Sequence, residues 1–146
     1  MREKEFMRIS IEANGPALHM KGENAEIDMI PFKGKAEIPD PDGGSPLFTG
    51  IVEPCGVDTQ IVNAAGVRHM SARYMLTGTD RAGREVHIYI ENNGWFDDAT
   101  KTMPFHTVPT IYTDSDELAA ILHRNQFTGE GAVEEDGLWI RFYRIG

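Results

Sequence analysis

The chain has 146 residues, of which 40% are apolar, and its 14 basic and 23 acidic side chains give a formal net charge of −9. This length fits one domain, residues 1–146, that buries enough surface to fold without disulfides. The negative charge repels phosphate backbones and anionic lipids, so we expect no nucleic-acid partner and no membrane partner. The chain has one cysteine, Cys55, and no apolar leader follows its charged N-terminus. These two features indicate a cytoplasmic protein.

Short runs of alternating residues, separated by glycine and proline, predict many strands joined by turns. In chain order, the predicted strands are residues 6–11, 26–36, 47–53, 57–63, 67–77, 84–92, 105–113 and 138–145. Residues 39–46 contain three prolines and two glycines, which predict a loop.

One segment has helical spacing instead. Asp114 and Glu117 match a capping box, and the apolar residues from Leu118 to Leu122 recur at intervals of three and four. We therefore predict a short helix over Ser115–Arg124. About eight strands and one late helix indicate an all-β fold, a closed antiparallel barrel that could hold one ligand; an open sandwich is the alternative.

The hairpin around residues 80–83 allows side chains to be assigned to faces. If Asp80 pairs with Gly83, Arg73 lies opposite Ile90. One face of the hairpin then carries His69, Ser71, Arg73 and Asn92 together with aliphatic side chains. A loop longer by one residue would change this assignment, because a register shift moves side chains to the other face.

Arg73 and Asp58 are the main candidates for chemistry. An arginine among aliphatic residues costs several kcal/mol unless a carboxylate or a ligand pairs with it. Asp58, on the neighbouring predicted strand, is the expected partner, and the two form either a structural ion pair or an anchor for a carbonyl or an anion. If Asp58 lies apart from Arg73 in an apolar pocket, it is a candidate general base with a raised pKa.

Other polar residues could bind or move a proton. His69 is a candidate acid or base, and His106 is a further candidate. The candidate ligand-binding side chains are Gln60, Ser71, Tyr74, Asn92 and His106. The histidines lack metal-site spacing and no phosphate-binding loop is present, so we expect neither a metal nor a cofactor.

Several motifs occur in an order that resembles one family of short bacterial and fungal proteins. They are Phe48-Thr49-Gly50, Asp58-Thr59-Gln60, Arg73-Tyr74, Asn92-Asn93-Gly94, Phe105-x-Thr107-x-Pro109 and the last strand, Trp139 to Tyr143. The family is known as domain of unknown function three-two-three-seven. The resemblance covers most of the chain from Ile30 onward.

The resemblance implies a small lipocalin-like barrel, similar to allene oxide cyclases and dirigent proteins, which bind hydrophobic small molecules and steer cyclisation or coupling. It favours an inward position for Ser71 and Arg73. The family tends to have an acid where this chain has Ser71, and an arginine where it has His106. The pocket of this chain is therefore expected to differ, with Asp58 or His69 as its base.

Three functions agree with these observations. The first is a cofactor-free isomerase, cyclase or lyase that acts on a hydrophobic carbonyl or hydroxylated metabolite. The second is a non-catalytic carrier of a hydrophobic small molecule, and the third is a structural subunit with a polar interior that satisfies itself. A perturbed acid in the pocket favours the enzyme. The acidic loops and exposed aromatic residues are compatible with a homodimer.

Overall fold

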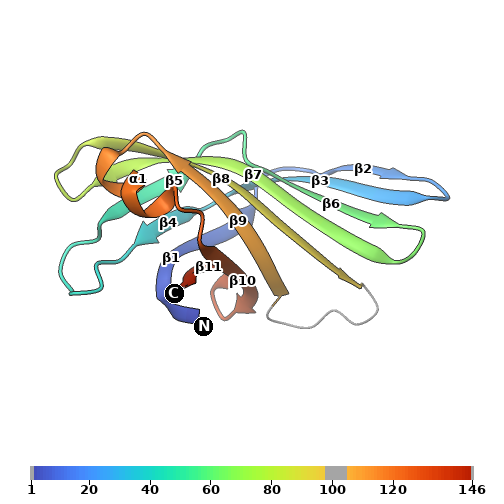
Figure 1. Ribbon diagram of the computed structural model, residues 1–146. Helices are drawn as coiled ribbons and strands as arrows, with labels where there is room; N and C mark the ends of the chain where they lie inside the picture. Colours follow the sequence, from blue (N-terminus) through green and yellow to red (C-terminus); the bar gives the residue numbers. More distant parts are fainter. Residues whose placement is uncertain (1, 98–104, 146) are drawn as a thin grey trace.

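The computed structural model describes residues 2–97 and 105–145, which form eleven strands and one short helix (Figure 1). In chain order the elements are β1 Arg2–Ala13, β2 Leu18–Lys21, β3 Ala25–Lys33, β4 Lys35–Ile38, β5 Phe48–Val52, β6 Val57–Asn63, β7 Val67–Asp80, β8 Glu85–Asp97, β9 Phe105–Thr113, α1 Asp116–Leu122, β10 Phe127–Glu134 and β11 Gly137–Ile145.

Eight of these strands close into an antiparallel barrel. Their order around the barrel is β7, β5, β4, β1, β11, β10, β9 and β8, and β8 pairs again with β7. Closure leaves none of these eight strands as a free edge along its whole length. The predicted fold, a closed antiparallel barrel of about eight strands with one short helix, is confirmed.

The remaining strands extend the sheet beyond the barrel. β6 pairs with the first half of β7, β3 pairs with β6, and β2 pairs with β3. Figure 1 shows β2, β3, β6 and the start of β7 reaching away from the end that carries α1. Gly34 separates β3 from β4 and passes so close to β1 that a methyl group there would overlap the carbonyl of Ser10. The absent side chain therefore lets one bent segment serve both the barrel and the extension.

The core fills the barrel between α1 and the extension. Strand β8 illustrates the alternation that builds it, since Val86, Ile88 and Ile90 are buried and the residues between them are more exposed. Helix α1 contributes two buried side chains, Leu118 and Leu122, to the same core. Among the described residues, no helix is long and apolar enough to cross a membrane.

The helix is shorter than predicted and has a different cap. It begins after Ser115, whose Oγ accepts a hydrogen bond from the backbone N–H of Leu118 over 3.2 Å. Asp114 lies outside the helix and binds His87 instead, through the backbone N–H at 2.8 Å and the imidazole Nδ1 at 2.7 Å. This contact ties the start of α1 to β8.

The β7–β8 hairpin has a register one residue away from the predicted one. Its loop is longer, because the N–H of Asp80 donates to the carbonyl of Arg84 over 3.0 Å. Gly83 adopts a left-handed φ of +79°, which favours glycine. The Asp80 carboxylate also accepts the backbone N–H groups of Ala82 and Arg84, each over 2.9 Å, and this fixes the longer turn.

The shifted register reverses the predicted orientation of β7. Arg73 pairs with Glu91, and Ser71 pairs with Asn93. The prediction that Ser71 and Arg73 point into the barrel is therefore wrong, since Tyr74 occupies the inner face in their place. The β8 half of the prediction is confirmed, because Asn92 does point inward.

Candidate functional site

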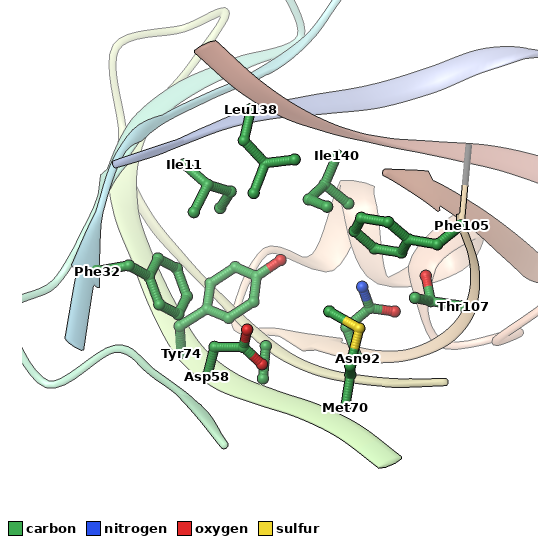
Figure 2. A pocket seen from close by; sticks show the side chains of 11 residues that line it. Ile11, Phe32, Asp58, Met70, Tyr74, Asn92, Phe105, Thr107, Leu138 and Ile140 are labelled. Atoms are coloured by element: carbon green, nitrogen blue, oxygen red, sulfur yellow. The ribbon is translucent and has the colours of Figure 1, made fainter. Parts of the chain in front are cut away.

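A cavity lies inside the barrel at the end that leads into the extension, and its lining is mostly apolar (Figure 2). The cavity has a volume of about 50 Å³, and together with the open solvent at its mouth the empty space amounts to about 440 Å³. The residues that line it are Ile11, Phe32, Asp58, Met70, Ala72, Tyr74, Asn92, Phe105, Thr107, Leu138 and Ile140. The composition of its lining, apolar with a few polar groups, is typical of small-molecule sites, although the cavity is smaller than most of them.

Three polar atoms in this cavity lack partners. Among the described residues, the buried side-chain oxygens without a hydrogen bond are Oδ1 of Asp58, Oδ1 of Asn92 and Oγ1 of Thr107. All three residues line the same cavity. A buried polar atom without a partner costs about 1–3 kcal/mol, so three of them in one place point to a site that is completed by a ligand or by water.

Asp58 lies on β6 and presents a half-satisfied carboxyl group. Its Oδ2 accepts a hydrogen bond from the side-chain amide of Gln60 over 2.8 Å, and Gln60 accepts one from Nη1 of Arg68, also over 2.8 Å. Burial raises the pKa of Asp58, and the hydrogen bond from Gln60 and the charge of Arg68 oppose this only in part. Oδ1 is buried and leaves its hydrogen-bonding capacity unused, in a residue that lines the cavity.

Tyr74 lies on β7 beside Asp58, and its ring packs edge-on against Phe32 with centroids 5.1 Å apart. The side chain is 3% exposed, and Figure 2 shows its hydroxyl pointing into the cavity. Burial raises the pKa of Tyr74, and the neighbouring charge of Asp58 raises it further. The phenol therefore keeps its proton and can act as a hydrogen-bond donor.

Asn92 and Thr107 stand on the β8 and β9 side of the cavity, where they are 6% and 4% exposed. Asn92 continues the buried row of β8 at a position where an aliphatic side chain would be expected. Thr107 lies on the same buried face of β9 as Phe105 and Pro109, and the residues between them are exposed. The alternation of each strand thus places a polar side chain in the mostly apolar cavity.

Comparison with known proteins identifies the family. The sequence profile described as "Protein of unknown function (DUF3237)" matches residues 4–145. The chain belongs to the DUF3237 family. A UPF0311 protein of Clostridium acetobutylicum is 31% identical over 117 residues, which cover 67% of this chain and 68% of that protein.

Solved structures share the fold of this DUF3237 protein. A protein of unknown function from Clostridium acetobutylicum ATCC 824 is 27% identical and has a TM-score of 0.72, and the match covers 98% of each chain. An enzyme from Penicillium herquei is 14% identical and has a TM-score of 0.62, with 99% of this chain and 95% of that chain covered. At that identity, the enzyme shares the barrel and shows nothing of the reaction.

Three of the predicted site residues line the cavity and one supports it. Asp58, Tyr74 and Asn92 are in the lining, and Gln60 holds Asp58 from the extension. The expected pair between Asp58 and Arg73 does not form. Asp58 is bound by Gln60, and the arginine linked to it through that amide is Arg68.

The other predicted site residues lie on the outer surface. The side chain of Arg73 is 66% exposed and lies 3.7 Å from Glu91. His69 stacks on Trp95, with centroids 4.3 Å apart and an interplanar angle of 3°. Trp95 is itself 63% exposed, which places this pair outside the barrel. The one-residue shift of the hairpin is the physical reason for these positions.

Ser71 and His106 are also outside. Ser71 pairs with Asn93 on the same outer face as Arg73. His106 is exposed between the buried residues Phe105 and Thr107, and its Nδ1 lies 3.9 Å from Glu130. Neither residue contributes to the lining of the cavity.

Thr107 is the polar lining residue that the sequence reasoning missed. The signal was present in the run from Phe105 to Ile111, where alternate residues are buried. Period-two alternation places Thr107 on the same face as Phe105 and Ile111, which makes it a polar residue in an apolar row. The same rule applied to β7 with the correct register would have found Met70 and Ala72.

Proposed function

We propose that this protein is a cofactor-free isomerase, cyclase or lyase whose first step removes a proton beside the carbonyl of a small, mostly apolar molecule. The observation that carries this proposal is Oδ1 of Asp58, a buried carboxyl oxygen without a partner in an apolar cavity. Burial raises the pKa of this carboxyl group toward the range in which a general base works efficiently at neutral pH.

In the proposed step, the Asp58 carboxylate takes a proton from the carbon next to the carbonyl. The C–H electrons move onto the carbonyl oxygen, and the hydroxyl of Tyr74 donates a hydrogen bond to it. Tyr74 keeps its own proton because burial raises its pKa. If the enolate is conjugated with a second double bond, return of the proton from Asp58 to the far carbon gives an isomer. Attack by the enolate carbon on a second carbonyl of the substrate, whose oxygen then takes the proton from Asp58, gives the cyclase outcome. Expulsion of a group from the β-carbon, which leaves with that proton, gives the lyase outcome.

Gln60 supports this step as a positioning residue. It donates to Oδ2 of Asp58 and is itself oriented by Arg68. Because one carboxyl oxygen is held, the other points toward the cavity in a fixed direction. A positioned base needs this restraint, since a small displacement from the reacting proton lowers the rate strongly.

The second candidate function is a non-catalytic carrier of a hydrophobic small molecule. The apolar majority of the lining favours it, since burial of apolar surface alone can hold such a ligand. A carrier has no need of Asp58, however, and a buried carboxyl group with an unused oxygen destabilises the fold. The third function, a structural subunit, is disfavoured because the polar interior leaves three oxygens unsatisfied.

Deuterium exchange would test the proposed function. A panel of small cyclic ketones is incubated with the protein in D₂O, and NMR follows the loss of the protons next to the carbonyl. We expect catalysed exchange that falls about 100-fold in Asp58→Asn, in line with the usual contribution of a general base. Tyr74→Phe should also slow exchange, because the enolate oxygen loses a donor.

Glu91→Gln is the matched control, since it neutralises a carboxyl group that pairs with Arg73 on the outer face. It should exchange ketones at the rate of the unaltered protein. Equal exchange in Asp58→Asn and the unaltered protein would contradict the assignment of the base. Binding of the ketones without any exchange would support the carrier instead.

A further inference from the structure

We infer that the substrate is a hydroxylated carbonyl compound and that Asn92 and Thr107 bind its hydroxyl group. The carbonyl half of this inference rests on the function proposed above, whereas the hydroxyl half rests on separate atoms. Both residues are more than nine-tenths buried, and Oδ1 of Asn92 and Oγ1 of Thr107 have no partner. Neither atom takes part in the proton transfer assigned to Asp58.

Counting hydrogen bonds indicates which chemical group fits these two atoms. The amide oxygen of Asn92 only accepts, whereas the hydroxyl of Thr107 can donate or accept. Asn92 pairs with Pro109, which is two residues from Thr107 on the same buried face of β9. A ligand hydroxyl between the two side chains would donate to Asn92 and accept from Thr107. A ligand carbonyl cannot donate to Oδ1, and an apolar group would leave both atoms unsatisfied.

The space for the Thr107 side chain is built into the neighbouring strand. Gly129 on β10 pairs with Thr107, and a side chain at Gly129 would overlap Oγ1 of Thr107. Likewise, the ring of Phe105 lies where a side chain of Gly131 would be. The two glycines of β10 therefore leave room for the inward side chains of Thr107 and Phe105 on β9.

The sheet register sets how far the two ends of the substrate lie apart. Ala72 pairs with Asp58 on one side and with Asn92 on the other. Neighbouring strands are about 4.8 Å apart, so the backbones of Asp58 and Asn92 are separated by roughly 10 Å, and their side chains both project into the cavity. Ala72 between them adds only a methyl group to the floor. The site therefore fits a compact apolar body with a carbonyl at one end and a hydroxyl at the other.

The chemistry of the pair also indicates the fate of the hydroxyl. Neither an amide nor an aliphatic hydroxyl titrates near neutral pH, so Asn92 and Thr107 cannot protonate a departing oxygen. A hydroxyl held there stays on the product. Among the proposed reactions, this favours isomerisation over elimination of that group.

Three probes test the inference: cyclohexanone with a hydroxyl on the ring carbon opposite the carbonyl, the analogue with a methyl there, and the corresponding diketone. Dissociation constants come from NMR titration of backbone amides. We expect the hydroxyl probe to bind about tenfold more tightly than the methyl probe, as two modest hydrogen bonds would give. No preference for the hydroxyl, or tighter binding of the diketone, would overturn the inference.

Two variants locate the preference. Thr107→Val keeps the shape of the side chain and removes its hydroxyl, and Asn92→Leu does the same for the amide. Each should bring the affinities of the hydroxyl and methyl probes close together. Thr110→Val is the matched control, because Thr110 is on the same strand but pairs with Glu91 on the outer face. A hydroxyl preference that persists in both Thr107→Val and Asn92→Leu would overturn the assignment.

Asp58→Asn separates this inference from the proposed function. If both hold, this variant loses deuterium exchange but keeps its preference for the hydroxyl probe. Preference without exchange in the unaltered protein would contradict the proposed function and leave the hydroxyl site in place. Exchange without preference would contradict the hydroxyl site alone.

Discussion

Gln60 donates its side-chain amide to Oδ2 of Asp58 over 2.8 Å and leaves Oδ1 of the same carboxyl group without a partner. Because Arg68 donates to the oxygen of Gln60, the amide can only present its N–H groups to Asp58. The carboxyl group is therefore fixed at one oxygen and unsatisfied at the other. Asp58 thus connects the polar residues Gln60 and Arg68 to the apolar cavity that it lines.

Removal of the Gln60 amide should raise the pKa of Asp58. The hydrogen bond from Gln60 favours the charged carboxylate and lowers a pKa that burial raises. Gln60→Leu should thus move the titration of Asp58 to higher pH, measured by NMR of its side-chain carboxyl carbon. Thr59→Val, at the next position of β6, should leave this titration in place. An unchanged pKa in Gln60→Leu would show that the amide does not act on the carboxyl group.

Asp58→Asn should stabilise the protein at neutral pH. The pKa of Asp58 is higher in the folded than in the unfolded state, so the folded state binds more protons and loses stability as the pH rises between the two values. The asparagine variant avoids this loss. Its free energy of unfolding at pH 7 should be higher by roughly 0.5–2 kcal/mol, a usual gain when a functional residue that destabilises the fold is replaced.

Urea unfolding of both proteins across a pH series measures this difference. It should be small below about pH 4, where both states protonate the carboxyl group, and should grow as the pH rises. A variant that is less stable at neutral pH would show that the charged form of Asp58 is favoured in the fold.

Arg73→Ala should change neither deuterium exchange nor stability by much. The guanidinium is mostly exposed, and its contact with Glu91 is a surface ion pair 3.7 Å long. Such pairs contribute about 0–1 kcal/mol. Ketone exchange and urea unfolding of the variant would measure both effects. A large loss of exchange would mean that Arg73 reaches the cavity, contrary to the register of the hairpin.

The contrast between Arg73 and Asp58 shows how far the sequence determines the site. The barrel follows from the number of strands and their turns, which depend on local residues. The face of each strand depends on register, and one extra loop residue beside Asp80 reversed β7. Asn92 could be placed because the inward face predicted for β8 is the observed one, whereas Asp58 was expected beside Arg73 and lies across from Ala72 instead.

The hydrogen-bond partners could not be predicted in the same way. Arg68, not Arg73, approaches Gln60, because β6 pairs with β7 along the extension. The contact crosses the β6–β7 hairpin, whose register was not assigned from the sequence. Thr107 could have been found from alternation on β9, but the space that its hydroxyl occupies depends on Gly129 in a later strand.

Ser115→Ala should destabilise α1 and the end of the barrel that it covers. The Ser115 hydroxyl caps the helix by accepting from Leu118, and loss of such a cap costs about 0.5–2 kcal/mol. Urea unfolding would measure the loss.

Asp114→Ala is the informative comparison, because Asp114 is the largest cause of the raised pKa of His87. It should lower the pKa of His87 in an NMR titration, whereas Ser115→Ala should leave that pKa unchanged.

Gly129→Ala should damage the hydroxyl site from the neighbouring strand. The added methyl group overlaps Oγ1 of Thr107 and approaches the Phe142 ring to 3.2 Å, so Thr107 must move. Overpacking of this kind costs about 1–3 kcal/mol of stability. The variant should also lose its preference for the hydroxyl probe, whereas Gly131→Ala, which displaces Phe105 instead, should lose stability and keep some preference. Equal preference in Gly129→Ala and the unaltered protein would mean that the position of Thr107 does not decide hydroxyl binding.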